Sequence, residues 1–208
     1  MKISIITVCL NSEDTIVDTL NSVITQTYNN IEHIIVDGGS TDRTIYFLKK
    51  YNFKNKNIIL KKKCSLYNSI NLGIRKAKGD IITILHSDDI YNSPNTIENV
   101  IRKIKNSKKK IFFGDVIYYK KKFSNVIRYY SSVNFKRPLM KYGFMPPHTG
   151  SFYKKEIFQK FGYYKDFRIA GDFEHLLRII YKKKIGFEIL NMITTRMRSG
   201  GLSSKNLK

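Results

Sequence analysis

Short apolar runs alternate with amphipathic segments through the first half of the chain. The apolar runs are rich in β-branched residues and have the length of buried strands. They cover residues 2–8, 31–37, 57–62 and 80–89. The segments between them repeat apolar residues at helical spacing. These segments are 13–26, 45–51 and 65–79. Because strands alternate regularly with helices, the pattern predicts an α/β fold built on a parallel sheet.

Capping residues predict where one further helix begins and where the helix over 65–79 ends. Ser93 and Pro94 precede a stretch with Ile97, Val100, Ile101 and Ile104 on one face, so we expect a helix with Ser93 as N-cap and Pro94 at its first position. Gly79 follows the apolar positions of 65–79 and is expected to cap that helix at its C-terminus.

The second half of the chain is less regular. Residues 110–120 and 124–132 are expected to be strands of a hairpin or meander, and 145–162 a loop, a strand and a short helix. Residues 171–184 are expected to be a helix that turns Phe173, Leu176, Leu177 and Ile180 inward, and 187–198 a final strand. No repeat, linker or domain boundary is visible, so we expect residues 1–208 to be one domain.

The charge balance narrows the class of partner. The chain has 38 Lys and Arg against 16 Asp and Glu, a net charge of +22. Such a charge suits nucleic acid, an anionic lipid surface or a phosphorylated substrate, although heavy lysine usage on a solvated surface explains it equally well. Cys9 and Cys64 lie far apart, which argues against disulfide and zinc scaffolds and fits a reducing cytoplasm. No apolar run approaches about 18 residues, so we expect a soluble or peripheral protein.

Three polar clusters follow predicted strands. They are Thr7 to Asn11, Asp37 to Asp42, and His86 to Asp89. Because ligands of an open parallel sheet bind beyond the carboxyl ends of its strands, we expect these clusters to converge. A carboxylate at a strand end can also cap the next helix, and that reading is preferred for Asp14 and Asp42.

Asp88 and Asp89 stand out within these clusters. Two neighbouring carboxylates repel unless a cation or a hydrogen-bond donor compensates them. Hard oxygen ligands of this kind suit Mg²⁺ or Mn²⁺ that also holds phosphate oxygens. The pair therefore predicts a divalent metal site.

Four segments together carry a family resemblance. They read VDGGSTD at 36–42, LHSDDIY at 85–91, PPHTGSFYKKEIF at 146–158 and AGDFEHLLRI at 170–179. From residue 2 to about residue 204 the chain resembles the inverting family 2 glycosyltransferases, and among them the bacterial enzymes of surface-polysaccharide and O-antigen biosynthesis. The resemblance implies the GT-A fold, with a Rossmann-like, mostly parallel sheet flanked by helices and a less regular acceptor-side half.

The resemblance implies donor-side roles. Asp37 is expected to accept a hydrogen bond from uracil or another base of a nucleotide sugar, with Thr7 and Asn11 nearby. Asp88 matches the last acid of the DXD motif and is expected to hold Mn²⁺ or Mg²⁺ on the diphosphate, with Asp89 as its support. Bound metal would stabilise the charge of the departing nucleoside diphosphate.

Asp172 matches the general base of inverting members. It is expected to take the proton from the acceptor hydroxyl, with Glu174 as the second choice. From the residues alone, the preferred explanation of Asp172 is a carboxylate stabilised at a helix N-terminus.

Two more positions are candidates for contacts near the substrates. His148 is expected near the acceptor or the diphosphate, or else as a structural histidine. Arg198, with the SGGLS segment after it, resembles a C-terminal loop that closes over the diphosphate.

Four positions depart from the family pattern. Lys63 and Asn68 stand where many relatives carry Asp, His86 where the first Asp of DXD often lies, and Gly171 where a Glu often precedes the base. The departures remove potential contacts to the nucleoside and the metal, while Asp37, Asp88 and Asp172 are retained.

The expected function is therefore metal-dependent transfer of a hexose from a nucleotide sugar, UDP-linked by preference, to a hydroxyl of a glycan. Residues 1–115 are expected to bind the donor and 116–208 the acceptor, a glycan or polyprenyl-diphosphate-linked sugar. Lysines of the segments KKKIFF (108–113) and YYKKKF (118–123) would attract the anionic inner face of the cell membrane.

Two alternatives stay open. The departures keep an inactive scaffold or partner subunit possible. A nucleic-acid binder is suggested by the charge and by 14 Tyr and 13 Phe, but most aromatics fall in core patterns and no RNA-binding motif is present.

Overall fold

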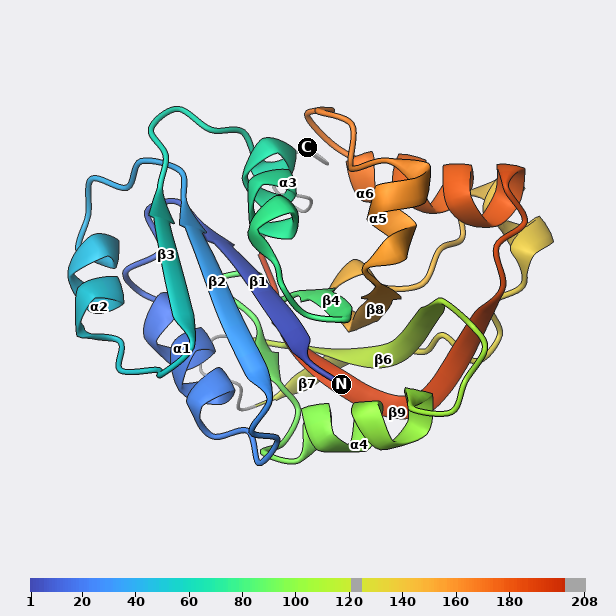
Figure 1. The fold of residues 1–208 in the computed structure, drawn as a ribbon, viewed down its shortest axis with the longest axis horizontal. Coiled ribbons are helices and arrows are strands. Elements are labelled where there is room, and N and C mark those ends of the chain that lie inside the picture. Colours follow the sequence, from blue (N-terminus) through green and yellow to red (C-terminus); the bar gives the residue numbers. More distant parts are fainter. Residues whose placement is uncertain (121–124, 201–208) are drawn as a thin grey trace.

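The computed structural model describes residues 1–120 and 125–200 and folds them around one continuous sheet. Its path is β3-β2-β1-β4-β8-β6-β9-β5, with β7 beside β6, nine strands in these residues. Figure 1 shows α3, α5 and α6 on one side of the sheet and α4 on the other.

The first half is an alternation of parallel strands and helices, as predicted. Its elements are β1 (Ile3–Cys9), α1 (Ile16–Ile24), β2 (Ile31–Asp37), α2 (Thr44–Lys50), β3 (Lys56–Leu60), α3 (Leu66–Lys76) and β4 (Ile81–Ile84). β1 lies between β2 and β4, and β3 extends β2, all in parallel. The carboxyl ends of these four strands therefore meet at one edge of the sheet.

The second half makes the sheet mixed. Its elements are β5 (Ile90–Tyr91), α4 (Thr96–Ile104), β6 (Ile111–Tyr119), β7 (Val126–Tyr130), η2 (Arg137–Tyr142), η3 (His148–Gly150), β8 (Ser151–Lys154), α5 (Glu156–Phe161), α6 (Gly171–Leu176), η4 (Leu177–Lys182) and β9 (Phe187–Arg198). β8 is antiparallel to both β4 and β6, whereas β9 runs parallel to β6. The expected α/β class is confirmed, with antiparallel strands confined to this half.

The central strands are apolar on both faces because helices cover both. Ile6 and Val8 of β1 pack in one core cluster with Ile70 and Ile74 of α3. Ile3 and Ile5 point the other way, into a cluster that α4 covers. Alternate side chains of a strand point to opposite faces of the sheet. A strand whose apolar residues do not alternate with polar ones is therefore typical of a strand that is buried on both faces.

Two predicted caps are wrong. α4 begins at Thr96 with Asn95 as its N-cap; Ser93 lies two residues earlier, where its backbone N–H donates to the Thr96 hydroxyl at 2.9 Å. α3 is capped by Ala77, not Gly79. Gly79 is required for packing instead, because a Cβ there would lie 2.6 Å from the Ser4 hydroxyl oxygen.

The helix expected over 171–184 has two parts. It is α-helical over α6 and continues as the π-helical turn η4. Leu176 and Ile180 are fully buried, and Phe173 and Leu177 pack at the margin of the same cluster. The inward face of this segment is thus confirmed.

Gly73 tests how closely α3 packs on β1. A Cβ at this position would lie 2.6 Å from Cγ2 of the buried Ile6. We expect Gly73→Ala to lower the free energy of unfolding by about 1–3 kcal/mol in urea titrations, because overpacking outweighs alanine's helix preference of about 1 kcal/mol.

The control is a double-mutant cycle with Ile6→Ala. Removing the Ile6 side chain relieves the contact, so the double variant should be less destabilised than the sum of the single variants. Strict additivity would contradict close packing as the cause.

Candidate functional site

Hydrogen bonds join the loops that follow β1, β2 and β4. The Asn11 backbone N–H donates to the Ser40 hydroxyl at 2.8 Å, and the Asn11 side-chain oxygen accepts from the Thr41 N–H at 2.8 Å. The hydroxyls of Ser12 and Ser87 lie 2.9 Å apart. The expected convergence of the three polar clusters is confirmed, and Asn11 forms part of the connection.

Asp37 organises the turn at the end of β2. One carboxylate oxygen accepts from the Gly39 and Ser40 N–H groups at 2.9 Å each, and the other accepts from the Ser40 hydroxyl at 2.5 Å. The side chain is fully buried. Asp37 thus holds the shape of the loop that a ligand at this edge would meet.

Thr7 lies inside the sheet. It is fully buried, and its hydroxyl is 2.9 Å from Nε2 of His33. Nδ1 of the same ring is 2.8 Å from the Tyr51 hydroxyl, and burial lowers the pKa of His33 to about 3. Thr7 has no exposed surface for a ligand.

Asp42 lies one residue before Arg43, the N-cap of α2, so it bonds the start of the helix without being its cap. Its carboxylate accepts from the Thr44 N–H at 2.9 Å, at the start of α2, and from the Glu13 N–H at 3.0 Å. These bonds tie the loop before α1 to the start of α2.

Asp88 and Asp89 differ sharply in environment. Asp89 is 1% exposed; burial and the Asp88 charge raise the pKa of Asp89 well above its usual value, with Arg198 acting in the opposite direction. Asp88 is half-buried, and no described residue forms a hydrogen bond or an ion pair with its carboxylate. Asp88 alone of the two is available to a ligand.

This asymmetry limits how a metal could bind. Residues 1–120 and 125–200 contain no group of three or more His, Cys, Asp or Glu that could hold an ion. Mg²⁺ and Mn²⁺ are often held by only one or two carboxylates, with substrate phosphates and water supplying the other oxygens. The residues present fit a metal of that kind, with Asp88 as its carboxylate.

Asp172 lies at the start of α6 and is held by Tyr67 of α3. The Tyr67 hydroxyl donates to the Asp172 carboxylate at 3.0 Å and accepts from the Gly171 N–H at 2.8 Å. A Cβ on Gly171 would lie 2.7 Å from the Tyr67 ring, which explains why no larger residue stands there. The sequence reasoning missed Tyr67, whose only signal was an aromatic residue in the first turn of α3.

His86 connects the two carboxylates of the site. Burial lowers its pKa, while the charges of Asp88 and Asp172 both act to raise it. Its ring centroid is 5.6 Å from that of His148. Burial also lowers the pKa of His148, to about 4, with Asp172 opposing and His86 adding to the shift. Asp88, His86, His148 and Asp172 therefore form one cluster.

Two predicted residues have other partners. Glu174 accepts from Arg178 at 3.0 Å and lies 3.5 Å from Lys165; burial alone would raise the pKa of Glu174, but these cations lower it overall. Arg198 pairs with Asp18 at 2.8 Å. The segment after Arg198 lies outside the described residues from residue 201 on.

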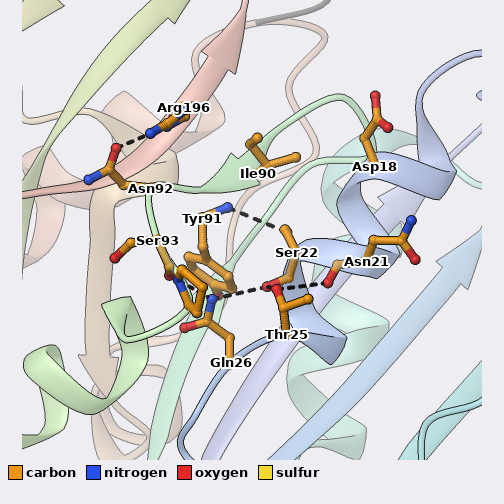
Figure 2. Close-up of a pocket in the computed structure, with 11 residues that line it drawn as sticks. Asp18, Asn21, Ser22, Thr25, Gln26, Ile90, Tyr91, Asn92, Ser93 and Arg196 are labelled. Carbon is orange, nitrogen blue, oxygen red and sulfur yellow. Dashed lines mark hydrogen bonds between the residues drawn. The ribbon is translucent and has the colours of Figure 1, made fainter.

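A pocket of about 310 Å³ lies elsewhere, between α1, β5 and β9. Figure 2 shows Arg196 bonded to Asn92 on one side of it and Asp18 of α1 on the other. None of the predicted site residues lines it. The candidate site is therefore the strand-end cluster rather than this pocket.

Comparisons with known proteins agree on one family. The family model for Glycosyl transferase family 2 matches residues 4–173. An uncharacterized glycosyltransferase of Mycobacterium tuberculosis is 29% identical over 182 residues, 85% of this chain and 68% of that protein. The Escherichia coli UDP-Glc:alpha-D-GlcNAc-diphosphoundecaprenol beta-1,3-glucosyltransferase WfaP is 36% identical over 146 residues, 69% of this chain and 55% of the relative.

A solved structure shares the fold. The S. aureus TarS fragment in complex with UDP-GlcNAc superposes with a TM-score of 0.75 at 18% identity, over 100% of this chain. The chain spans about 62% of that structure's length.

The buried histidines predict a pH dependence of stability. Burial lowers the pKa of His33 and of His175 to about 3. Below about pH 6.5 these two histidines bind protons in the unfolded chain but stay neutral in the folded chain. Their contribution to the free energy of unfolding is therefore fully present above that pH and is lost as the pH falls. We expect His175→Phe to reduce the slope of unfolding free energy against pH by about 1.4 kcal/mol per unit between about pH 6 and about pH 4.

Urea titrations at a series of pH values measure this slope. Asp89 is unchanged in the variant, so its opposite contribution cancels in the comparison. Equal slopes for the two proteins would contradict a neutral His175.

Proposed function

The chain belongs to glycosyltransferase family 2 and has its GT-A fold, and on that basis we propose that it transfers a sugar from a nucleotide sugar to a hydroxyl group of a glycan. One observation carries the proposal. The rings of His86 and His148, from opposite halves of the chain, lie 5.6 Å apart between centroids, and the charges of Asp88 and Asp172 both act to raise the pKa of His86. In this proposal Asp88 acts on the donor side of the site and Asp172 on the acceptor side.

The donor in this proposal is a UDP-sugar bound over the carboxyl ends of β1, β2 and β4. TarS was solved with UDP-GlcNAc, and WfaP is named for UDP-Glc. Asp37 and Asn11 shape the loops around the base, and Asp88 faces the diphosphate. Thr7 has no part in this site because it is fully buried. A metal ion bound at Asp88 would neutralise the diphosphate and make it a better leaving group.

The reaction in this proposal inverts the anomeric carbon. Asp172 accepts the proton of the acceptor hydroxyl while that oxygen forms a bond to the anomeric carbon. The bond to the nucleoside diphosphate breaks on the opposite face, and the nucleotide leaves with its electron pair. The Tyr67 hydroxyl, which donates to Asp172 at 3.0 Å, orients the carboxylate.

The acceptor we propose is a sugar linked to a lipid diphosphate. Support comes from WfaP, whose named acceptor is a diphosphoundecaprenol-linked sugar. Residues 1–115 would bind the donor and 116–208 the acceptor, at a membrane surface in the cytoplasm. Within the described residues, no helix has the length and apolarity needed to cross a membrane.

A thermal-shift screen of UDP, GDP, dTDP and CMP sugars, each with and without Mn²⁺, tests the proposal. UDP-sugars should raise the melting temperature, and more so with Mn²⁺. Stabilisation by no nucleotide would overturn the proposal. Nucleotide binding without transfer to any acceptor would favour the scaffold reading.

Asp172→Asn tests the base. We expect kcat to fall about 10³-fold because the amide cannot accept the proton, with nucleotide binding unchanged. Product formation and nucleotide titration measure the two effects. Asp80→Asn is the matched control, since Asp80 is exposed and accepts from the Lys2 N–H at 2.8 Å. Wild-type turnover in the Asp172 variant would exclude it as the base.

Asp88→Asn and Asp89→Asn test the asymmetry of the acidic pair. We expect Asp88→Asn to weaken Mn²⁺-dependent UDP binding about tenfold or more, because a ligand charge is lost. Asp89→Asn should change binding less than about twofold, because Asp89 is only 1% exposed and an amide of the same size keeps its packing. Calorimetric titration of UDP with and without Mn²⁺ measures both. Equal losses in the two variants would contradict the assignment of Asp88 alone.

A further inference from the structure

Two segments far apart in sequence form one exposed surface beside the site. Lys61–Lys63 follow β3, and Lys165–Ile169 precede α6. Asp166 ties the second segment to the start of α3, just after Lys63, because its carboxylate accepts from the Ser65 hydroxyl at 2.5 Å and from the Asn68 amide at 2.7 Å. We call the surface made by residues 61–63 and 165–169 the basic-apolar rim.

The rim combines exposed cations with exposed apolar side chains. Phe167 is 47% and Ile169 53% exposed, and neither belongs to a core cluster. Lys61–Lys63, Lys165 and Arg168 are all exposed. The acids nearby are already engaged. Asp166 binds Ser65 and Asn68. Glu174 binds Arg178 and lies 3.5 Å from Lys165 of the rim, which leaves more cations than acids on this surface. The surface therefore presents a net positive charge around two apolar residues.

The rim lies at the mouth of the candidate site. Leu60 of β3 is paired with Asp37 of β2, so Lys61–Lys63 leave the sheet at the edge where Asp37 lies. A Cβ on Gly39 would be 3.3 Å from the Lys62 Cα. Ile169 is three residues before Asp172 in the chain. Both segments thus border the space between the donor loops and the base.

The lysine segment 108–110 has a different position. β6 is antiparallel to β8, which is antiparallel to β4, so β6 runs in the direction of β4. Lys108–Lys110 precede β6 and therefore lie at the edge opposite the site. A membrane bound there would face away from the mouth. Of the other segment expected to contact lipid, residues 121–123 lie outside the described residues.

We propose that the basic-apolar rim docks the protein on an anionic membrane, with Phe167 and Ile169 inserted between headgroups and the surrounding cations paired with lipid phosphates. Cations near an anionic leaflet and apolar side chains at the headgroup boundary act together in peripheral binding. This orientation turns the mouth of the site toward the bilayer. The inference deepens the proposed function, in that a lipid-linked acceptor would meet Asp172 from the membrane side.

Co-sedimentation with phosphatidylglycerol-containing vesicles, free of any acceptor, tests the charges. The wild-type chain should bind at low salt and dissociate at high salt. Replacing Lys61, Lys62 and Lys63 by Gln should lower the partition coefficient about 100-fold, at about 1 kcal/mol per lysine. The matched control replaces Lys103, Lys105 and Lys108 by Gln, an equal change of charge at exposed positions away from the rim.

Fluorescence tests the depth of insertion. The chain contains no Trp, so a single Trp reports its own surroundings. Emission of Phe167→Trp should shift to shorter wavelength when anionic vesicles are added. Ile127→Trp on β7, at a position 48% exposed, is the control and should not shift.

The outcomes separate this inference from the proposed function. Equal binding by the rim and control lysine variants, no vesicle binding by the wild type, or an unshifted Trp at position 167 each overturns the rim as the docking surface. Transfer to a soluble acceptor is measured without lipid, so its failure bears on the proposed function alone. A cooperative urea unfolding transition like that of the wild type confirms that each variant is folded, whether or not it binds a nucleotide.

Discussion

The structure depends on the double burial of β1. This strand is hydrogen-bonded to a parallel neighbour on each edge and covered by apolar helices on each face. Its side chains therefore mostly pack, and the buried polar ones, Ser4 and Thr7, bond to Glu32 and His33 of β2, so the polar groups that can meet a ligand lie where the strand ends. Because β2, β3 and β4 run in the same direction, their terminal loops come together at that edge as well. Every residue of the candidate donor side follows from this one arrangement.

The polar residues near these strand ends differ in how deeply they are buried, and burial limits what each can do. Asp37, Asp89, Thr7 and His33 are all fully or nearly fully buried, and their environments hold loops or favour neutral forms. Asp88 is half-buried and keeps a carboxylate without an internal partner among the described residues. Two adjacent acids of identical chemistry thus differ in what they can bind. The difference arises because a side chain directed into the protein loses the solvation that stabilises its charge.

The two halves of the chain are joined around α3. Tyr67 binds Asp172 and Gly171, Asn68 binds Asp166, and the Asn71 amide donates to the Tyr164 carbonyl at 2.8 Å. The departure from the family at Asn68 has a physical reason here, because a carboxylate at that position would repel Asp166. The departure at Gly171 is explained in a similar way, because a side chain there would clash with the Tyr67 ring. These contacts hold Asp172 and the 165–169 segment against α3.

The sequence alone determined the first half of the fold. Its strands lack polar alternation because both faces are buried, and its helices carry a clear apolar face, so local pattern and tertiary structure agree. The convergence of the three polar clusters followed from parallel topology. The family resemblance predicted roles for Asp88 and Asp172 through motifs, and the charges of both act on His86.

Only the tertiary structure decided the rest. The positions of β8 and β9 in the sheet depend on pairing between residues far apart in sequence, which a local pattern does not encode. The same holds for the Tyr67–Asp172 bond, which spans 105 residues, and for the inward direction of Thr7 and Asp89. Side-chain direction and solvation are set by neighbours from other elements. The sequence therefore predicted which residues have the chemistry of a site, while packing against other elements decided which of them are exposed to a ligand.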